Sequence, residues 1–167
     1  MKLNKKQLSL ISLGLMGLAL LLWLVMAAVK VTTKAGSFEA SETYSGIKAV
    51  FGIKEEGEKL VGFNIVGLVA LCVAVCAAAL AFKGEKAAPA IAVLAAVLFI
   101  VVGFTMPLGY SSEMKQAIKL IKDLGGDVPM KWGPAAGSYI AAILALGSAA
   151  LQVFGPKFLL AEEAPAE

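Results

Sequence analysis

Long apolar runs alternate with shorter polar segments along the chain, and four of the runs are long enough to cross a membrane. A helix that spans the hydrocarbon core needs about 20 apolar residues, each adding a rise of about 1.5 Å. The four runs contain no Asp, Glu, Lys or Arg, and they cover residues 8–29, 60–82, 87–108 and 133–154. This pattern predicts an all-α membrane protein, a bundle of four transmembrane helices that forms a single membrane domain over residues 1–167.

The segments between the spans predict two outer loops, a tight inner turn and a tail. The outer loops cover residues 30–59 and 109–132. The inner turn covers residues 83–86, and the tail covers residues 155–167. In the first outer loop, the β-branched stretch "VKVTTKAGSF" allows a short strand. The following "SETYSGIKAVFGI" is ambiguous, because Ser41 with Glu42 resembles a helix start whereas apolar residues from Ile47 to Ile53 alternate with a period of two. A short helix is favoured there, and the choice between helix and strand stays open.

The sequence of the second outer loop predicts a short amphipathic helix within "SSEMKQAIKLIKDLGG". Its apolar stripe consists of Met114, Ala117, Ile118, Ile121 and Leu124, whereas Lys115, Lys119 and Lys122 lie away from that stripe. Such a helix lies on a surface, either that of the bilayer or that of the first outer loop. The three lysines are candidate binding residues for anionic headgroups or an acidic partner, and a simply solvated face is the alternative.

Small residues recur at every fourth position in the spans and predict where helices approach each other closely. In lipid, close approach through Gly and Ala supplies the dispersion contacts that hold helices together. The candidate packing residues are Gly133, Gly137, Ala141 and Ala145 in the fourth span, and Gly67 and Ala74 in the second. The first span is rich in Leu on nearly all sides, so we expect a core of the other three spans with the first more peripheral. The same stripes also suit self-association.

Few polar side chains interrupt the spans. Asn64, near the start of the second span, is a candidate polar contact that bonds a neighbouring backbone carbonyl, water or a ligand. Cys72 and Cys76 share one face of the same helix, where thiols act as small packing residues. Because no span contains an ionisable acid or base, a proton pump is disfavoured.

The composition narrows the chemistry further. The chain is 59% hydrophobic and 16% charged, with a mean hydropathy of +0.84, whereas soluble domains are about 45–50% apolar and about 25% charged. Its fifteen basic residues are all Lys, and it has neither Arg nor His. Without Arg there is no bidentate donor for phosphates or base edges, and without His the usual metal ligand and general base are missing. We therefore expect no enzyme activity, no cofactor, no metal site and no nucleic-acid partner.

The lysines also predict the orientation of the chain. The N-terminus, the inner turn and the segment after the fourth span hold six Lys in about 25 residues, whereas the two longer loops hold nine in about 55. The higher density favours cytoplasmic N- and C-termini in a bacterial plasma membrane, with both long loops outside. An aromatic belt at the interfaces is expected from Trp23, Tyr110, Trp132 and Tyr139.

Two resemblances add to this reading. The run "SGIKAVFG", a polar turn and then "GFNIVGLVAL" together resemble uncharacterised four-span membrane proteins of bacteria, a family that implies no activity. The layout of a longer first outer loop, a tight inner turn and a shorter second outer loop is similar to claudin-like tetraspan proteins. The claudin signature of a Trp and two Cys in the first outer loop is absent here. This second resemblance therefore concerns architecture alone.

Three functions fit these observations. The first is a non-enzymatic scaffold or accessory subunit, with the lipid bilayer, another membrane protein or a second copy of the chain as partner. The second is an oligomeric pore or small-molecule carrier, whose polar path would be assembled at subunit contacts from Asn64, Thr105, Ser138 and backbone. The third is a lipid- or envelope-surface protein that acts through the Lys115, Lys119 and Lys122 face.

Overall fold

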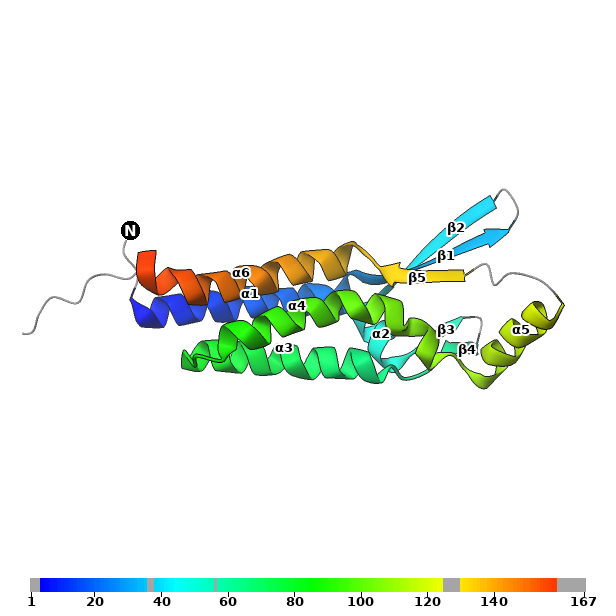
Figure 1. The fold of residues 1–167 in the computed structure, drawn as a ribbon, viewed down its shortest axis with the longest axis horizontal. Helices are drawn as coiled ribbons and strands as arrows, with labels where there is room; N and C mark the ends of the chain where they lie inside the picture. Colours follow the sequence, from blue (N-terminus) through cyan, green and yellow to red (C-terminus); the bar gives the residue numbers. More distant parts are fainter. Residues whose placement is uncertain (1–3, 36–37, 56, 125–129, 159–167) are drawn as a thin grey trace, which may run out of the picture.

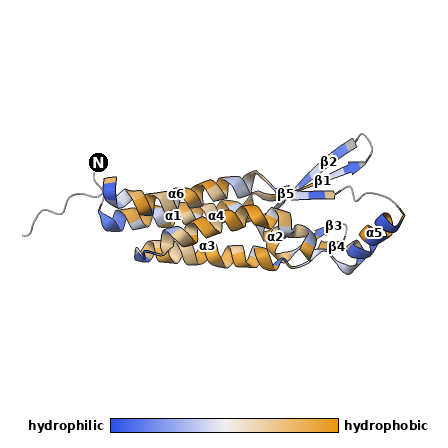
Figure 2. Cartoon of the chain, viewed as in Figure 1, coloured by the Kyte–Doolittle hydropathy of each residue, from blue (hydrophilic) through white to orange (hydrophobic). Residues whose placement is uncertain are grey.

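Four long antiparallel helices make up most of the molecule (Figure 1). The computed structural model describes residues 4–35, 38–55, 57–124 and 130–158. All four helices are long and apolar enough to cross a membrane, and Figure 2 shows their apolar character along the whole bundle. They are α1 (Lys5–Val25), α3 (Ile65–Lys83), α4 (Ala88–Thr105) and α6 (Ala136–Phe158). The prediction of four membrane-spanning helices is therefore confirmed at the level of length and composition.

The shorter elements gather at one end of the bundle, which we call the sheet end (residues 26–64 and 106–135). The opposite end, which we call the terminal end, holds the start of α1, the α3–α4 turn and the end of α6 (Figure 1). The shorter elements are β1 (Ala27–Ala35), β2 (Phe38–Ser45), α2 (Gly46–Phe51), β3 (Ile53–Glu55), β4 (Glu58–Val61), the 3-10 helix η1 (Met106–Gly109), α5 (Ser112–Asp123) and β5 (Met130–Pro134).

Two small antiparallel sheets form at the sheet end. The larger has the strand order β2-β1-β5, so the first and second outer loops are joined through β1. Its register pairs Lys30 with Thr43 and Val31 with Trp132. The smaller is the β3–β4 hairpin, in which Gly57 adopts a φ of 88°, a conformation that glycine reaches without steric cost.

The all-α prediction is therefore too narrow. Strands occupy the ends of three predicted spans, at residues 27–29, 60–61 and 133–134. A charge-free apolar run does not distinguish a buried strand from a helix, and here pairing between distant segments decides in favour of strands. The open question in the first outer loop is also answered, because its described residues include β2, β3 and parts of β1 and β4 in addition to the short helix α2.

The helices form a closed ring in which each contacts two neighbours. α1 packs against α6 and α3, and α4 packs against the same two helices. α1 buries a stripe with helical spacing that consists of Leu8, Ser12, Met16, Ala19 and Trp23. The prediction that the first span is peripheral is wrong, because a Leu-rich sequence conceals a face on which larger and smaller side chains alternate.

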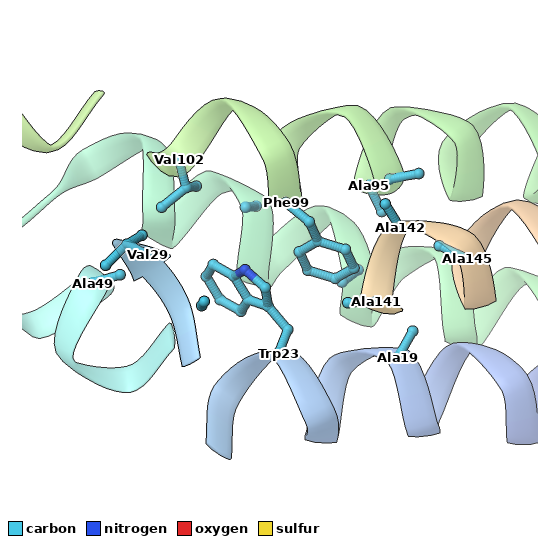
Figure 3. Packing of buried hydrophobic residues seen from close by; sticks show 14 of the residues in the cluster. Ala19, Trp23, Val29, Ala49, Ala95, Phe99, Val102, Ala141, Ala142 and Ala145 are labelled. Carbon is cyan, nitrogen blue, oxygen red and sulfur yellow. The ribbon is translucent and has the colours of Figure 1, made fainter. Parts of the chain in front are cut away.

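Trp23 is buried in the bundle core near the sheet end, two residues before the end of α1. Its side chain is fully buried, and its ring centroid lies 5.1 Å from that of Phe99 on α4 (Figure 3). Alanines of the neighbouring helices surround the two rings and leave room for them; Figure 3 labels Ala19, Ala95, Ala141, Ala142 and Ala145. Trp23 lies near a helix end, as expected, but its side chain faces the core and not the outer surface of the bundle, because the small residues around it leave space that only a large side chain fills.

Candidate functional site

The predicted packing residues occupy three different environments. Gly137, Ala141 and Ala145 are buried along α6, and Ala74 is buried on α3. Gly67 is buried against α2 rather than against another long helix, since a side chain there would lie 3.3 Å from the Cα of Val50.

Gly133 is the exception among these residues. It lies in β5 rather than in the fourth span, and a side chain there would meet only a ring carbon of Phe104, at 3.9 Å. Gly133 therefore does not pack as part of a helix, although its backbone lies directly against Gly103 of α4. Because β5 pairs with β1, the backbone at Gly133 is extended. The spacing of four residues between Gly133 and Gly137 therefore does not place them on one face of a helix.

Asn64 holds the start of α3 in place. Its Oδ1 accepts hydrogen bonds from the backbone N–H groups of Val66 and Gly67, at 3.0 and 3.3 Å. Its Nδ2 donates to Thr105 Oγ1 at 3.3 Å and lies 3.5 Å from the sulfur of Met106. Asn64 is therefore a helix cap that also ties α3 to the end of α4, and it lies just before the span rather than within it.

Ser138 joins the helix bundle to the sheet. Its hydroxyl accepts a hydrogen bond from Trp23 Nε1 at 3.2 Å and donates one to the backbone carbonyl of Ala28 at 2.7 Å. Thr105 donates to the carbonyl of Val102 in addition to accepting from Asn64. The three side chains expected along a polar path therefore make hydrogen bonds within the fold.

The sheet end contains an aromatic cluster, defined as Tyr44, Tyr110 and Trp132. The rings of Tyr44 and Trp132 stack with centroids 6.1 Å apart, and Trp132 Nε1 donates a hydrogen bond to the Tyr110 hydroxyl at 2.6 Å. The Tyr44 hydroxyl donates to Glu42 at 2.6 Å, and Lys48 lies 5.7 Å from the centre of the Tyr44 ring. Sequence analysis missed this cluster, because its members come from two loops that only the strand pairing brings together.

A cavity of about 180 Å³ lies beside the aromatic cluster. Its polar lining includes Glu42 and the two tyrosines, and its apolar lining includes Met114. Burial raises the pKa of the Tyr110 hydroxyl above its ordinary value of 10.0, and the hydrogen bond from Trp132 offsets part of that effect. The hydroxyl therefore stays protonated at neutral pH.

α5 begins where the sequence predicts. The Ser111 hydroxyl accepts a hydrogen bond from the backbone N–H of Met114 at 3.1 Å, which caps the helix. Hydrogen bonding to its own backbone N–H, and then to Ser111 and Ser112, lowers the pKa of Glu113 below its ordinary value of 4.5. An ionised Glu113 at the helix start also interacts favourably with the positive end of the helix dipole.

α5 lies at the outermost part of the sheet end, beyond the β3–β4 hairpin (Figure 1). It buries none of its residues, and Lys115, Lys119 and Lys122 are exposed. Its apolar stripe is only partly covered, since Met114 and Ile118 are half-buried whereas Ile121 is 38% exposed and Leu124, the residue that caps its end, is 79% exposed. A hollow of about 420 Å³ lies between α5 and β4, and its lining includes Lys59, Glu113 and Met114.

Within the described ranges, no group of three or more His, Cys, Asp or Glu residues comes close enough together to hold a metal ion. Cys72 and Cys76 are free thiols on the exposed side of α3, which in a bilayer faces lipid. Comparison of the chain with protein families, with curated proteins and with solved structures finds no match. The two resemblances drawn from the sequence therefore remain predictions.

Proposed function

We propose that this protein is a non-enzymatic membrane scaffold or accessory subunit that holds a partner protein at its sheet end. The observation that carries the proposal is α5, a twelve-residue amphipathic helix that buries none of its residues. Isolated helices of about 12–15 residues are marginal in water, and most of the stability of a protein helix comes from packing its apolar face. A partner that covers the Met114, Ile118 and Ile121 stripe supplies that packing.

The position of α5 favours a protein partner over the lipid surface. The helix lies at the far end of the molecule, beyond the elements that cap the bundle (Figure 1). The bilayer that surrounds α1, α3, α4 and α6 is therefore not adjacent to its apolar side. The lysines at 115, 119 and 122 would then flank the interface and favour a partner with acidic groups at its rim.

The pore or carrier function has less support. The polar side chains that a path within one chain requires are Asn64, Thr105 and Ser138, and each makes hydrogen bonds inside the fold. A carrier would have to open these bonds during transport. The accessory role requires no such rearrangement.

The location we propose is the bacterial plasma membrane, with the terminal end in the cytoplasm and the sheet end outside. The support is the lysine density, since the N-terminus, the α3–α4 turn and the end of α6 lie together at the terminal end. The sheet end would then offer its partner an outer-surface site.

Mild-detergent extraction from native membranes tests the accessory role, followed by size determination and mass spectrometry of the complex. We expect a stoichiometric second protein with the natural chain. Ile121→Asp places a charge in the apolar stripe and should release that protein, whereas Gln116→Asp, on the polar flank of the same helix, should retain it. A lone monomer for all three chains, or equal retention by both variants, contradicts the proposal.

A further inference from the structure

A pocket of about 800 Å³ opens at the terminal end of the bundle. α1 and α6 extend past the α3–α4 turn (Figure 1). The lining of the pocket comes from that turn, the start of α1 and the end of α6. Ligand pockets in proteins commonly measure about 300–1,000 Å³. This recess, the terminal pocket, is therefore large enough to hold part of an organic molecule.

The lining of the terminal pocket combines positive charge with apolar surface. Lys5 and Lys6 line it from α1, and Lys83 and Lys86 line it from the α3–α4 turn. Glu85 is the acidic residue of the lining, so the lysines outnumber it by four to one. Apolar walls come from residues that include Leu8, Phe82 and Val153. A ligand that suits this lining carries a negative charge at one end and hydrocarbon at the other.

Ser12, which lies deeper in the lining, gives an independent indication of a ligand. Ser12 is fully buried, and its hydroxyl oxygen has no hydrogen-bond partner among the described residues. A buried polar group left unpaired costs about 1–3 kcal/mol, so native structures rarely keep one without a reason. The backbone carbonyl of Ser12 already accepts from Ser148 on α6, which leaves the hydroxyl as the unused group.

We infer that the terminal pocket binds one anionic phospholipid. The phosphate would lie among the lysines, the acyl chains would follow the apolar walls, and an ester carbonyl would accept a hydrogen bond from Ser12. Seven residues separate Ser12 from the start of α1, a depth of about 10 Å along the helix. Free phosphate does not reach from the lysines to that depth, whereas a glycerophospholipid does. Basic pockets between transmembrane helices suit such headgroups.

Native mass spectrometry of the full chain in mild detergent tests this inference. The probes are phosphatidylglycerol and phosphatidylcholine with identical acyl chains. We expect one bound phosphatidylglycerol, with a Kd at least tenfold lower than that of phosphatidylcholine. The double variant Lys83→Gln with Lys86→Gln should raise the Kd for phosphatidylglycerol about 30-fold, because each lysine near the headgroup contributes on the order of a fivefold gain.

Two further variants separate binding from folding and from net charge. Lys54→Gln with Lys131→Gln removes the same charge at the sheet end and should leave the Kd unchanged, because both lysines are exposed and far from the terminal pocket. Ser12→Ala should raise the Kd about two- to tenfold. The same change should not lower the melting temperature of the lipid-free protein, because it removes an unpaired buried hydroxyl.

Three results would overturn the inference. One is equal affinity for the two lipids, or an equal loss in the two double-lysine variants. The second is displacement of phosphatidylglycerol by millimolar inorganic phosphate, which would mean that the pocket recognises phosphate alone. The third is lipid binding only after Glu162, Glu163 and Glu167 are changed to Gln, which would make the acidic tail of the chain the occupant.

Discussion

Ser138 links α1, β1 and α6 through a single hydroxyl group. It satisfies the buried indole N–H of Trp23 and the backbone carbonyl of Ala28 at once. Both groups are fully buried, so no water replaces the hydroxyl from the surface. At the residue scale, the joint between the bundle and the sheet therefore depends on one small polar side chain placed among apolar neighbours.

Ser138→Ala should lower the free energy of unfolding by about 1–3 kcal/mol, because it leaves a buried donor and a buried acceptor unpaired. Denaturant titration in detergent micelles measures the change. Ser148→Ala is the matched control on the same helix: the Ser148 hydroxyl donates to the carbonyl of Ser12 and accepts from Gln152 Nε2, which keeps the Ser148 carbonyl as a second acceptor. The control should cost about 0.6 kcal/mol, the average for such bonds in membrane proteins. Equal losses would contradict the role assigned to Ser138.

Tyr110 should make stability depend on pH in the alkaline range. Burial raises its pKa in the folded protein, so the unfolded chain releases this proton first, near the ordinary value of 10.0. The contribution to stability is complete below about pH 10 and is lost as the pH rises through the folded pKa. Chemical unfolding at a series of pH values should show a shallower decline above pH 10 for Tyr110→Phe than for the natural chain. Tyr139→Phe, half exposed on α6, is the control.

At the element scale, glycines let the strands enter the helix bundle. A side chain on Gly103 of α4 would collide with the backbone of Gly133 and Pro134, at the end of β5. A side chain on Gly137 of α6 would lie 2.6 Å from the carbonyl oxygen of Ala27, at the start of β1. Strand backbone therefore packs directly on helix backbone at both positions, which holds the sheet close to the bundle.

Gly103→Ala should destabilise the protein by about 1–3 kcal/mol or more, because the atoms in its way are backbone that has to shift. Thermal unfolding in detergent provides the measurement. Gly17→Ala is the matched control, since a side chain at this helical position meets nothing within 4 Å. That change should be neutral or stabilise by up to about 1 kcal/mol through helix propensity. A neutral Gly103→Ala would contradict the close packing of β5 on α4.

At the scale of the whole molecule, the two ends differ in shape and chemistry. The terminal end has a recess lined by lysines. The sheet end is a projection of strands and α5 (Figure 2). The bundle between them is filled by Ala, Phe and Trp side chains. The two ends therefore suit different partners, and the proposed orientation assigns the recess to the cytoplasmic leaflet.

Single-cysteine labelling tests that orientation. In a chain with Cys72→Ala and Cys76→Ala, a cysteine replaces either Lys54 at the sheet end or Glu85 at the terminal end. A membrane-impermeant maleimide should label the Lys54 position in intact cells, and the Glu85 position only after permeabilisation. The parent chain without cysteine is the control. The reverse pattern would place the termini outside and contradict the lysine-density argument.

Features that depend on neighbours in the sequence were predictable. The number of spans follows from the length of the charge-free runs, and the start of α5 follows from Ser111 and the apolar spacing after it. The turn at Gly84, with a φ of 68°, also follows a short polar signal between two apolar runs. In each case the deciding interaction lies within a few residues, so the pattern of the chain contains it.

Features that depend on distant segments required the tertiary structure. Residues 27–29 and 133–134 lie at the ends of charge-free runs long enough for a helix, yet β1 pairs with β5 and both become strands. Trp23 is buried because Phe99 and the surrounding alanines leave a space for its ring. The aromatic cluster exists because Tyr44 of β2, Trp132 of β5 and Tyr110, just after η1, meet at the sheet end. The lining of the terminal pocket likewise comes from the start of α1, the α3–α4 turn and the end of α6. Apolar runs favour burial without specifying the partner, and packing between distant segments decides which partner each residue meets.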